Sequence, residues 1–320
     1  MARFIKSIQG IAIGHASDFD AATGVTVILC PNGMTPGVDI RGSATSTRQI
    51  DSLFPHHIVP KIHALCLAGG SAYGLEAGTG VMRYLEERGF GFGAKNARVP
   101  IVPTAAIFDL AIGKPNRRPD GVMGYQACVN AAEGGIKEGS VGAGTGATVG
   151  KFYGIEQAMK GGLGTASRRL RNGLLVNALA VVNAYGDVRN PKTGRILAGA
   201  RRSKNGKAFA DTARLYKKGI KRPVSAFQNT TLGVITTNAR LEKSTATLVA
   251  RLGQGGLAKT ISPAYTIYDG DIVFALGSGE IGVDPHTVGL LGEEALMEAI
   301  IRAVTSAKSL GGVPSYSEKL

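Results

Sequence analysis

A short run of β-branched residues, Thr231–Thr237, follows directly on a polar, basic segment that extends from Ala200 to Gln228. β-branched residues favour strands, and the lack of charge in this run predicts a strand buried in a sheet. The segment before it predicts an exposed loop, longer than a compact domain usually contains without a functional reason. The chain must therefore fold so that a long exposed connection leads straight into a buried strand.

The residue at this junction is Thr230, which is preceded by Asn229. If the chain is cut between the two, Thr230 becomes a new N-terminus. An N-terminal threonine carries both nucleophile and base, because its hydroxyl attacks while its own α-amine accepts the proton. A free α-amine titrates near roughly pH 7.7–8.0, so part of it is unprotonated at neutral pH. The residues alone leave a second interpretation open, in which Thr230 merely starts a strand after a loop.

Composition predicts a soluble, cytoplasmic protein. A chain of 320 residues could form one large domain or two, and we expect a single domain over residues 1–320. Hydrophobic residues make up 44% of the chain and the mean hydropathy is +0.07. No apolar run approaches the roughly 18 residues that a membrane span needs, and the N-terminus lacks the apolar core of a signal peptide. We therefore expect no membrane partner. The three cysteines are odd in number and far apart, which is typical of free thiols in a reducing compartment: Cys30, Cys66 and Cys128.

The net charge of +14 raises the possibility of a nucleic-acid partner, but its distribution argues against one. Nine of the 37 basic residues fall in the 200–228 segment, where Asp211 is the one acidic residue and the aromatic residues are isolated. These nine are Arg201, Arg202, Lys204, Lys207, Arg214, Lys217, Lys218, Lys221 and Arg222. We interpret the segment as a solvated, mobile linker and expect no nucleic acid to bind.

Periodicity and turn signals predict a mixed α/β fold in which sheets lie between layers of helices. Gly24–Cys30 is a predicted strand that ends at a turn over Pro31–Gly33. The other predicted strands cover Leu174–Tyr185, Thr231–Thr237 and Asp271–Leu276, and the predicted helices cover Ser71–Gly89, Gly124–Glu133, Leu241–Leu252 and Glu293–Leu310.

A glycine-rich segment, Gly142–Lys151, superficially resembles a phosphate-binding loop. Thr145 stands where that motif requires glycine, and Phe152 stands where it requires Ser or Thr to bind magnesium. We therefore expect no nucleotide cofactor. The segment could instead direct Lys151 toward the Thr230 amine, where a cation would lower the pKa of the amine. On these residues alone, Lys151 is equally well interpreted as a surface lysine.

Two further places in the sequence could contribute polar groups to a reaction centre. Asp269 and Asp271 flank Gly270, and they would point to one face if this stretch is a strand; Asp-Gly is also common in hairpin turns. Asn183 ends an apolar run, where its amide could donate a hydrogen bond to an oxyanion, or it could be a turn residue. The five histidines show no metal-ligand spacing, so we expect no metal.

The chain resembles the self-processing family of β-peptidyl aminopeptidases, L-aminopeptidase/D-esterases and 6-aminohexanoate-oligomer (nylon-oligomer) hydrolases. The resemblance spans nearly the whole chain and rests on eight blocks in order. They are residues 10–16, 37–42, 67–75, 99–103, 142–151, 161–167, 229–233 and 269–271. It implies a four-layer αββα fold of the N-terminal-nucleophile type. It also implies cleavage into an α chain, 1–229, and a β chain, 230–320.

Matched residue by residue, the family's motifs imply that Thr230 is the nucleophile and that Asn183 donates to the oxyanion. Lys151 and the Asp269/Asp271 pair would surround the new amine. The Thr, the Lys and the paired Asp resemble the nylon-oligomer hydrolase branch more than the β-peptidyl branch. One departure is Phe108, which stands where the nylon branch is expected to have a tyrosine and leaves a second oxyanion donor unassigned.

The activity that the resemblance implies is hydrolysis of linear amides, such as 6-aminohexanoate oligomers, through an acyl-Thr230 intermediate. Two alternatives remain open. The enzyme could be an aminopeptidase acting on short α- or β-peptides and amino-acid amides, or an acyltransferase of the ornithine acetyltransferase type. The resemblance further implies a homotetramer of α/β units.

Overall fold

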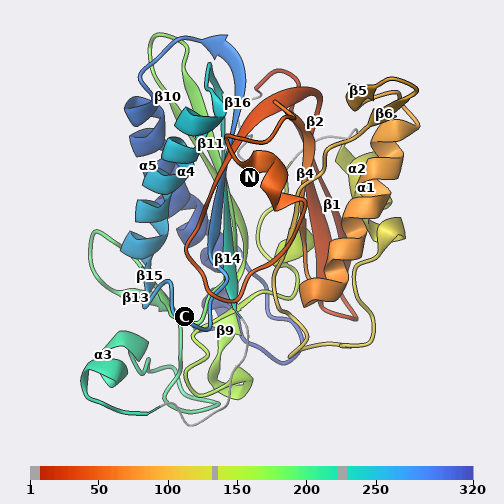
Figure 1. Ribbon diagram of the computed structural model, residues 1–320. Helices are drawn as coiled ribbons and strands as arrows, with labels where there is room; N and C mark the ends of the chain where they lie inside the picture. Colours follow the sequence, from red (N-terminus) through yellow and green to blue (C-terminus); the bar gives the residue numbers. More distant parts are fainter. Residues whose placement is uncertain (1–7, 132–135, 222–228, 320) are drawn as a thin grey trace.

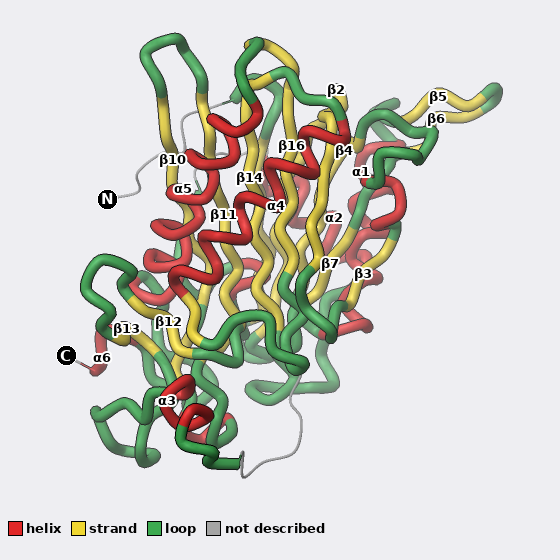
Figure 2. The backbone as a smooth tube through the Cα atoms, turned by 60° about the vertical axis from the view of Figure 1, so that its left-hand side comes forward, coloured by secondary structure: helices red, strands yellow, loops and turns green. Residues whose placement is uncertain are grey.

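A mixed sheet forms the centre of the computed structural model, which describes residues 8–131, 136–221 and 229–319 (Figures 1 and 2). Its strands are β1 (Ala12–Asp18), β2 (Thr23–Ile40), β3 (Ser46–Arg48), β4 (Ile62–Ala68), β7 (Thr104–Ala106), β10 (Gly162–Arg169), β11 (Leu175–Asn183), β14 (Thr230–Ala239) and β16 (Ile272–Ile281). They lie in the order β10, β11, β14, β16, β2, β4, β7 and β3, and β1 pairs with β2.

Strand β2 links the two halves of this sheet. Its residues 25–29 pair with β4, whereas residues 35–40 pair with β16, and the register shifts between Leu29 and Met34. The turn predicted at Pro31–Gly33 is therefore wrong: the backbone bends there but continues as one strand. Gly33 adopts a φ of 83°, which a glycine tolerates without strain. Pairing of residues 25–29 before this segment and 34–40 after it outweighs the local turn signal.

Helices cover the outer face of each half of the sheet. The larger helices are α1 (Ala77–Glu86), α2 (Gly121–Ala131), α4 (Lys243–Thr260) and α5 (Pro285–Thr305). In Figure 2, α4 and α5 lie in front of β10, β11, β14 and β16. Helices α1 and α2 pack against β1, β2 and β4.

Alternation of side chains along the strands shows that the two half-sheets pack face to face. On β11, Ala178 and Ala180 belong to the core beneath α4 and α5, whereas Leu179 faces the opposite way. On β4, Cys66 faces the core beneath α1 and α2, and Leu67 joins Leu179 in the core between the sheets. Helices, sheet, sheet and helices follow in order, which confirms the predicted four-layer αββα architecture.

Most of the predicted elements are present. The strands predicted over 174–185, 231–237 and 271–276 are β11, β14 and β16. The helix predicted over 293–310 is α5, which begins earlier because Asp284 accepts a hydrogen bond from the backbone of His286 at its N-terminus. No helix in the described ranges is both long and apolar enough to cross a membrane.

Shorter elements surround the lower end of the sheet and project from its side. They are β5 (Phe92–Ala94), β6 (Ala97–Val99), β8 (Thr148–Val149), β9 (Met159–Lys160), β12 (Asp187–Arg189), β13 (Ile196–Ala198), β15 (Ile261–Ser262), η1 (Ile50–Leu53), η2 (Ser71–Glu76), η3 (Gly142–Gly144), η4 (Ile155–Gln157), α3 (Thr212–Lys217) and α6 (Tyr316–Lys319). The helix predicted over 71–89 corresponds to η2 followed by α1, and the one predicted over 241–252 is α4. The helix predicted over 124–133 is α2, and its last two positions lie outside the described residues.

The basic segment is not the solvated linker that its composition predicts. Within 200–221 the chain forms α3, and Arg201 is only 8% exposed. The buried carboxylate of Asp187 explains this order, because it accepts hydrogen bonds from the backbone of Ala200 at 2.8 Å and from that of Thr212 at 2.7 Å. Two points of the segment are thereby tied to β12. Residues 222–228 lie outside the described residues.

Candidate active site

Thr230 is the first residue of β14, and in the ladder with β11 it lies opposite Asn183. Its side chain is buried, and its hydroxyl donates a hydrogen bond of 2.6 Å to the carbonyl oxygen of Asn229. The backbone N–H of Gly270 donates to the same oxygen, also at 2.6 Å. The peptide carbonyl that precedes Thr230 is thus held by two donors, one of which is the proposed nucleophile.

Gly270 is a functional position that the sequence did not reveal. A Cβ atom here would lie 2.8 Å from the Thr230 hydroxyl oxygen and 2.6 Å from the carbonyl oxygen of Ala44. Only glycine lets this backbone approach Thr230 so closely. The sequence contained one signal for this position, a glycine between two aspartates. A glycine beside reactive groups often marks a place where the backbone approaches another group closely.

Asp269 lies beside the bond that precedes Thr230. Its backbone forms a bridge with Asn229, and its N–H closes a turn to the carbonyl of Thr266. One carboxylate oxygen accepts from the backbone N–H of Tyr185 at 3.0 Å, and the other accepts from the Thr266 hydroxyl at 2.5 Å. A turn therefore ends at Asp269, but it precedes the Asp-Gly pair, which does not itself form a hairpin turn.

Asp271 directly precedes β16 and contacts the other side of the same site. Its carboxylate accepts from the backbone N–H of Thr231 at 2.7 Å and from that of Tyr265 at 3.1 Å. Burial, and then the neighbouring charge of Asp269, raise the pKa of Asp271 to about 7. Burial also raises the pKa of Asp269, against the opposing influence of the Thr266 hydroxyl. This acidic pair can therefore hold a proton near neutral pH.

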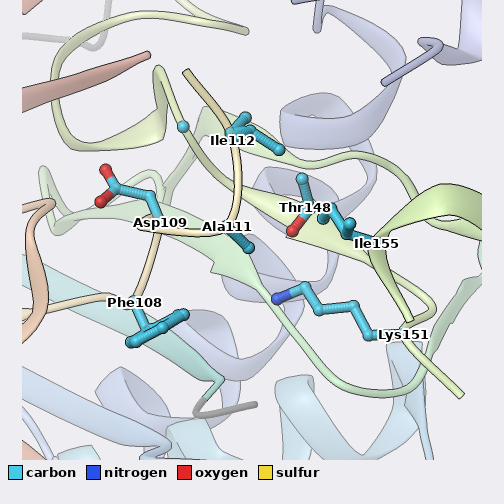
Figure 3. Close-up of a pocket in the computed structure, with 8 residues that line it drawn as sticks. Phe108, Asp109, Ala111, Ile112, Thr148, Lys151 and Ile155 are labelled. Carbon is cyan, nitrogen blue, oxygen red and sulfur yellow. The ribbon is translucent and has the colours of Figure 1, made fainter. Parts of the chain in front are cut away.

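Lys151 is buried, so its interpretation as a surface lysine is wrong. Its ammonium group donates to the side-chain oxygen of Asn183 at 2.8 Å and to the backbone oxygen of the same residue at 3.1 Å. Lys151 also lines a small pocket with Phe108 and Ala111 (Figure 3). In this view the ammonium points toward Ala111 and Thr148. The glycine-rich segment thus directs a cation into the centre of the site.

The side chain of Asn183 is fixed in one orientation. Its oxygen accepts from Lys151 and from the backbone N–H of Thr148 at 3.0 Å, and its nitrogen donates to the carbonyl of Phe108 at 2.9 Å. Asn183 is the last residue of β11 and is fully buried, so the alternative of a turn residue is wrong. An amide group carries two hydrogens, and the bond to Phe108 uses one of them. Phe108 contributes its carbonyl here, although its ring has no hydroxyl to donate.

Two further buried ionisable side chains, Lys160 and Asp109, lie beside the glycine-rich segment, and no pattern in the sequence indicated them. Lys160 is fully buried and donates to the carbonyls of Thr145 and Ala147, both at 2.7 Å. Asp109 accepts from the backbone of Gly70 and from the Thr23 hydroxyl, both at 2.7 Å. Burial lowers the pKa of Lys160 to about 7, and burial raises the pKa of Asp109 to about 6.

Within the described ranges, the structure brings all five predicted site residues together at one end of β14 and β11. No cluster of three or more His, Cys, Asp or Glu side chains in these ranges is arranged to hold a metal ion. The arrangement combines a hydroxyl beside a polarised carbonyl with a cation, an amide and a proton-holding acidic pair. Such a set of groups is suited to acyl transfer.

Comparison with known proteins agrees with this chemistry. The model of peptidase family S58 matches residues 4–316. The chain is 40% identical to an uncharacterized aminopeptidase of Mycobacterium tuberculosis (strain ATCC 25618 / H37Rv), with 98% of this chain and 97% of the relative covered. It is 30% identical to a 6-aminohexanoate-oligomer endohydrolase of Agromyces sp. (strain KY5R), with 95% and 86% covered.

The fold also matches a solved structure. The L-aminopeptidase D-Ala-esterase/amidase of Ochrobactrum anthropi, a variant of the Ntn hydrolase fold, superimposes with a TM-score of 0.72. The alignment covers 96% of this chain and 87% of that one at 18% identity, which supports the shared fold.

Proposed function

The chain belongs to peptidase family S58 and is a hydrolase, and we propose that it cuts itself between Asn229 and Thr230 and then hydrolyses amides with the new N-terminal Thr230. The observation that carries this proposal is the pair of donors on the Asn229 carbonyl. The Thr230 hydroxyl and the Gly270 N–H both reach its oxygen at 2.6 Å. A carbonyl held in this way is polarised for attack by the neighbouring hydroxyl.

Self-cleavage would proceed through an ester. The Thr230 hydroxyl oxygen attacks the Asn229 carbonyl carbon, and the Gly270 N–H stabilises the developing oxyanion. The C–N bond then breaks as the nitrogen gains a proton, so that the acyl group moves to the hydroxyl. Water hydrolyses the ester and leaves a carboxylate on Asn229 and a free amine and hydroxyl on Thr230. The α chain is then 1–229 and the β chain 230–320.

Amide hydrolysis would use the same hydroxyl a second time. The Thr230 α-amine accepts the hydroxyl proton, the oxygen attacks the substrate carbonyl, and the protonated leaving amine departs. Water then releases the acyl group from Thr230. Lys151 would keep the pKa of the α-amine low, the Asn183 amide would donate to the oxyanion, and Asp269 and Asp271 would hold or pass protons.

We propose linear amides of amino acids, such as 6-aminohexanoate oligomers, as substrates. The activity in the name of the Agromyces relative supports this class. The name of the mycobacterial relative, which is more similar in sequence, instead favours an aminopeptidase that acts on short α- or β-peptides and amino-acid amides. Transfer of the acyl group to an amine, as in ornithine acetyltransferases, would follow from the same acyl-Thr230. Product analysis with and without an added acceptor amine separates hydrolysis from transfer.

The test is the covalent state of the purified protein. Scaling the 33.1 kDa mass by chain length gives an α chain of about 23.7 kDa and a β chain of about 9.4 kDa. N-terminal sequencing of the smaller chain should begin Thr-Thr-Leu-Gly. Thr230→Ala should remain a folded single chain without amidase activity, and Thr230→Ser should retain part of both reactions. An active, uncut chain, or an active Thr230→Ala variant, would refute the proposal.

The two chains should stay together after the cut. Strands β14 and β16 belong to the β chain, and they lie between β11 and β2 of the α chain. Every residue of β14 is buried. We propose that these α/β units assemble into a homotetramer, for which light scattering should give about 132 kDa, four times the chain mass.

A further inference from the structure

A larger groove adjoins the pocket at Lys151. This outer groove has a volume of about 890 Å³. It shares Ala111, Ile112 and Ile155 with the small pocket that Lys151 lines (Figure 3). The two cavities therefore adjoin each other, and the outer groove lies beside the pocket of the proposed reaction centre. A substrate that reaches Lys151 would leave its remaining length in the outer groove.

Arg201 is the buried charge that lines the outer groove. The residue is 8% exposed, and its guanidinium donates to two backbone carbonyls, those of Lys204 and Glu156. Within the described residues, its Nε atom has no hydrogen-bond partner and no carboxylate forms an ion pair with the side chain. Burial lowers the pKa of Arg201, and no acid among the described residues acts in the opposite direction. In this part of the chain, neutral groups alone therefore solvate the buried positive charge of Arg201.

The other charged groups of the groove differ from Arg201. Lys204 forms an ion pair of 2.5 Å with Glu156, and both side chains are largely exposed. Glu318 is exposed on α6, where water solvates its charge. A buried cation without a counter-ion is unfavourable, and an anion in the groove would relieve this. A substrate with a negatively charged group would therefore complement the charge of Arg201 at this wall of the groove.

We propose that Arg201 binds the free carboxylate of a linear substrate whose scissile amide lies beside Lys151, with the substrate passing from the inner pocket into the adjoining groove. This inference rests on the amide hydrolysis proposed above and specifies its substrate class: oligomers that end in a free acid, in preference to capped amides. Guanidinium groups bind carboxylates through paired, charge-assisted hydrogen bonds.

Chain polarity determines the step in which Arg201 acts. In any amino-acid oligomer, the free carboxylate lies on the amine side of every internal amide. Arg201 would therefore hold the leaving group, and its contribution would end when the first product departs. It should affect formation of the acyl-enzyme but not its hydrolysis by water.

Self-cleavage should leave this arrangement intact. Two hydrogen bonds join the backbone of Arg201 to Gln157. The Arg201 N–H donates to the Gln157 carbonyl at 2.9 Å, and the Gln157 side chain donates to the Arg201 carbonyl at 2.9 Å. Gln157 belongs to η4, which also supplies Ile155 and Glu156 to the groove. The proposed cut follows Asn229, well downstream of this attachment.

The experiment compares two substrates that differ only at one end: the 6-aminohexanoate trimer as a free acid and as its C-terminal carboxamide. Wild-type protein should favour the acid in kcat/KM by about tenfold or more, the effect of one charge-assisted hydrogen bond. Arg201→Gln should lose that preference through a higher KM for the acid, with the carboxamide unchanged. Arg201→Lys should retain part of the preference. Lys207→Gln, a matched change at an exposed lysine that does not line the groove, should leave the ratio within about twofold.

Equal losses on both substrates in Arg201→Gln, or no preference in the wild type, would overturn the inference. A second experiment measures by calorimetry how tightly the same two trimers bind to the uncut Thr230→Ala chain. Because this variant lacks the proposed nucleophile, the measurement tests the anion site separately from the proposed function. There, Arg201-dependent binding of the acid would support the anion site even if no variant hydrolysed an amide. Equal binding of acid and carboxamide would refute the site even if Thr230 proved to be the nucleophile.

Discussion

Two buried lysines lie at opposite ends of the connection that joins β8 to β9, and they have different kinds of partners. Lys151 follows β8, lines the inner pocket and donates to the side chain of Asn183. Lys160 ends β9 and donates to the backbone carbonyls of Thr145 and Ala147. A side-chain partner beside a cavity can respond to a reaction, whereas backbone carbonyls in a core fix a loop. Burial of a lysine alone therefore does not indicate its role; its partners do.

The largest effect that this comparison predicts is on stability at Lys160. Lys160→Met removes two hydrogen bonds donated by the side-chain nitrogen: the Thr145 carbonyl loses this donor, whereas the Ala147 carbonyl keeps the bond from the Gly161 N–H. The free energy of unfolding should fall by about 3 kcal/mol or more. Urea unfolding of the uncut Thr230→Ala chain measures this on a molecule with constant covalent structure.

Lys95→Met provides the control for this measurement. Lys95 lies in the exposed hairpin between β5 and β6, so the same chemical change there should alter the free energy of unfolding by less than about 0.5 kcal/mol. Equal effects at Lys95 and Lys160 would show that Lys160 does not hold the glycine-rich segment.

Lys151→Met should reduce activity strongly and stability only modestly, the reverse of what we expect at Lys160. Hydrolysis by the processed enzyme should fall by about 100-fold, or about 2.7 kcal/mol in the activation free energy. The loss of stability should be smaller than that at Lys160, because water in the adjoining pocket can replace the ammonium. Steady-state kinetics and urea unfolding of the same variant provide both numbers. A Lys151→Met protein that unfolds readily but retains full turnover when folded would reverse the assignment of the two lysines.

The pH profile separates the two lysines more finely. Activity should rise with pH as the Thr230 α-amine loses its proton and becomes the base. A nearby cation disfavours the protonated amine and lowers its pKa, so Lys151→Met should move this limb to higher pH, by about one unit. A variant of Lys160 that remains folded, such as Lys160→Arg, should leave the limb in place. An unchanged limb in Lys151→Met would mean that Lys151 does not act on the amine.

Sequence patterns predicted the layered fold because alternation and helical periodicity record which faces are buried. They predicted β11, β14 and β16 well. They failed at Pro31–Gly33, where local turn residues lie between two paired stretches of one long strand. They also failed in the 200–221 segment, where the carboxylate of Asp187 orders a stretch whose own composition is that of a loop.

The site could be predicted only in part. Thr230 and its partners followed from the reactivity of an N-terminal threonine and from the family's motifs, and the structure brings these residues together. Gly270 was missed because its contribution is a backbone N–H, whose direction no sequence pattern encodes. Lys160 and Asp109 were missed because their proximity arises from packing between segments that are far apart in the chain. Arg201 was counted among the surface charges, since burial of one basic residue among nine cannot be recognised from composition.

The smallest predicted effect is the pH dependence of stability that arises from Asp109, the buried carboxyl group beside the glycine-rich segment. The pKa of Asp109 is raised to about 6, whereas an unfolded aspartate titrates near its usual 3.8. Between these values the folded chain binds more protons than the unfolded chain. The free energy of unfolding must therefore fall as the pH rises, with the loss complete above pH 6. Between pH 5 and 6 the contribution of this one group should be about 1 kcal/mol.

Asp109→Asn isolates this contribution, because the amide oxygen can still accept from the Gly70 N–H and the Thr23 hydroxyl can turn to accept from the amide nitrogen. Other carboxyl groups, including Asp271, titrate equally in both proteins and cancel in the difference. On the uncut Thr230→Ala background, the wild-type residue should therefore lose stability relative to asparagine as the pH is raised from 5 to 6. A difference that stays constant would mean that Asp109 is already ionised in the folded state. Asp109 would then carry a permanent charge beside the glycine-rich segment, and the nearby Lys160 would be the cation that opposes it.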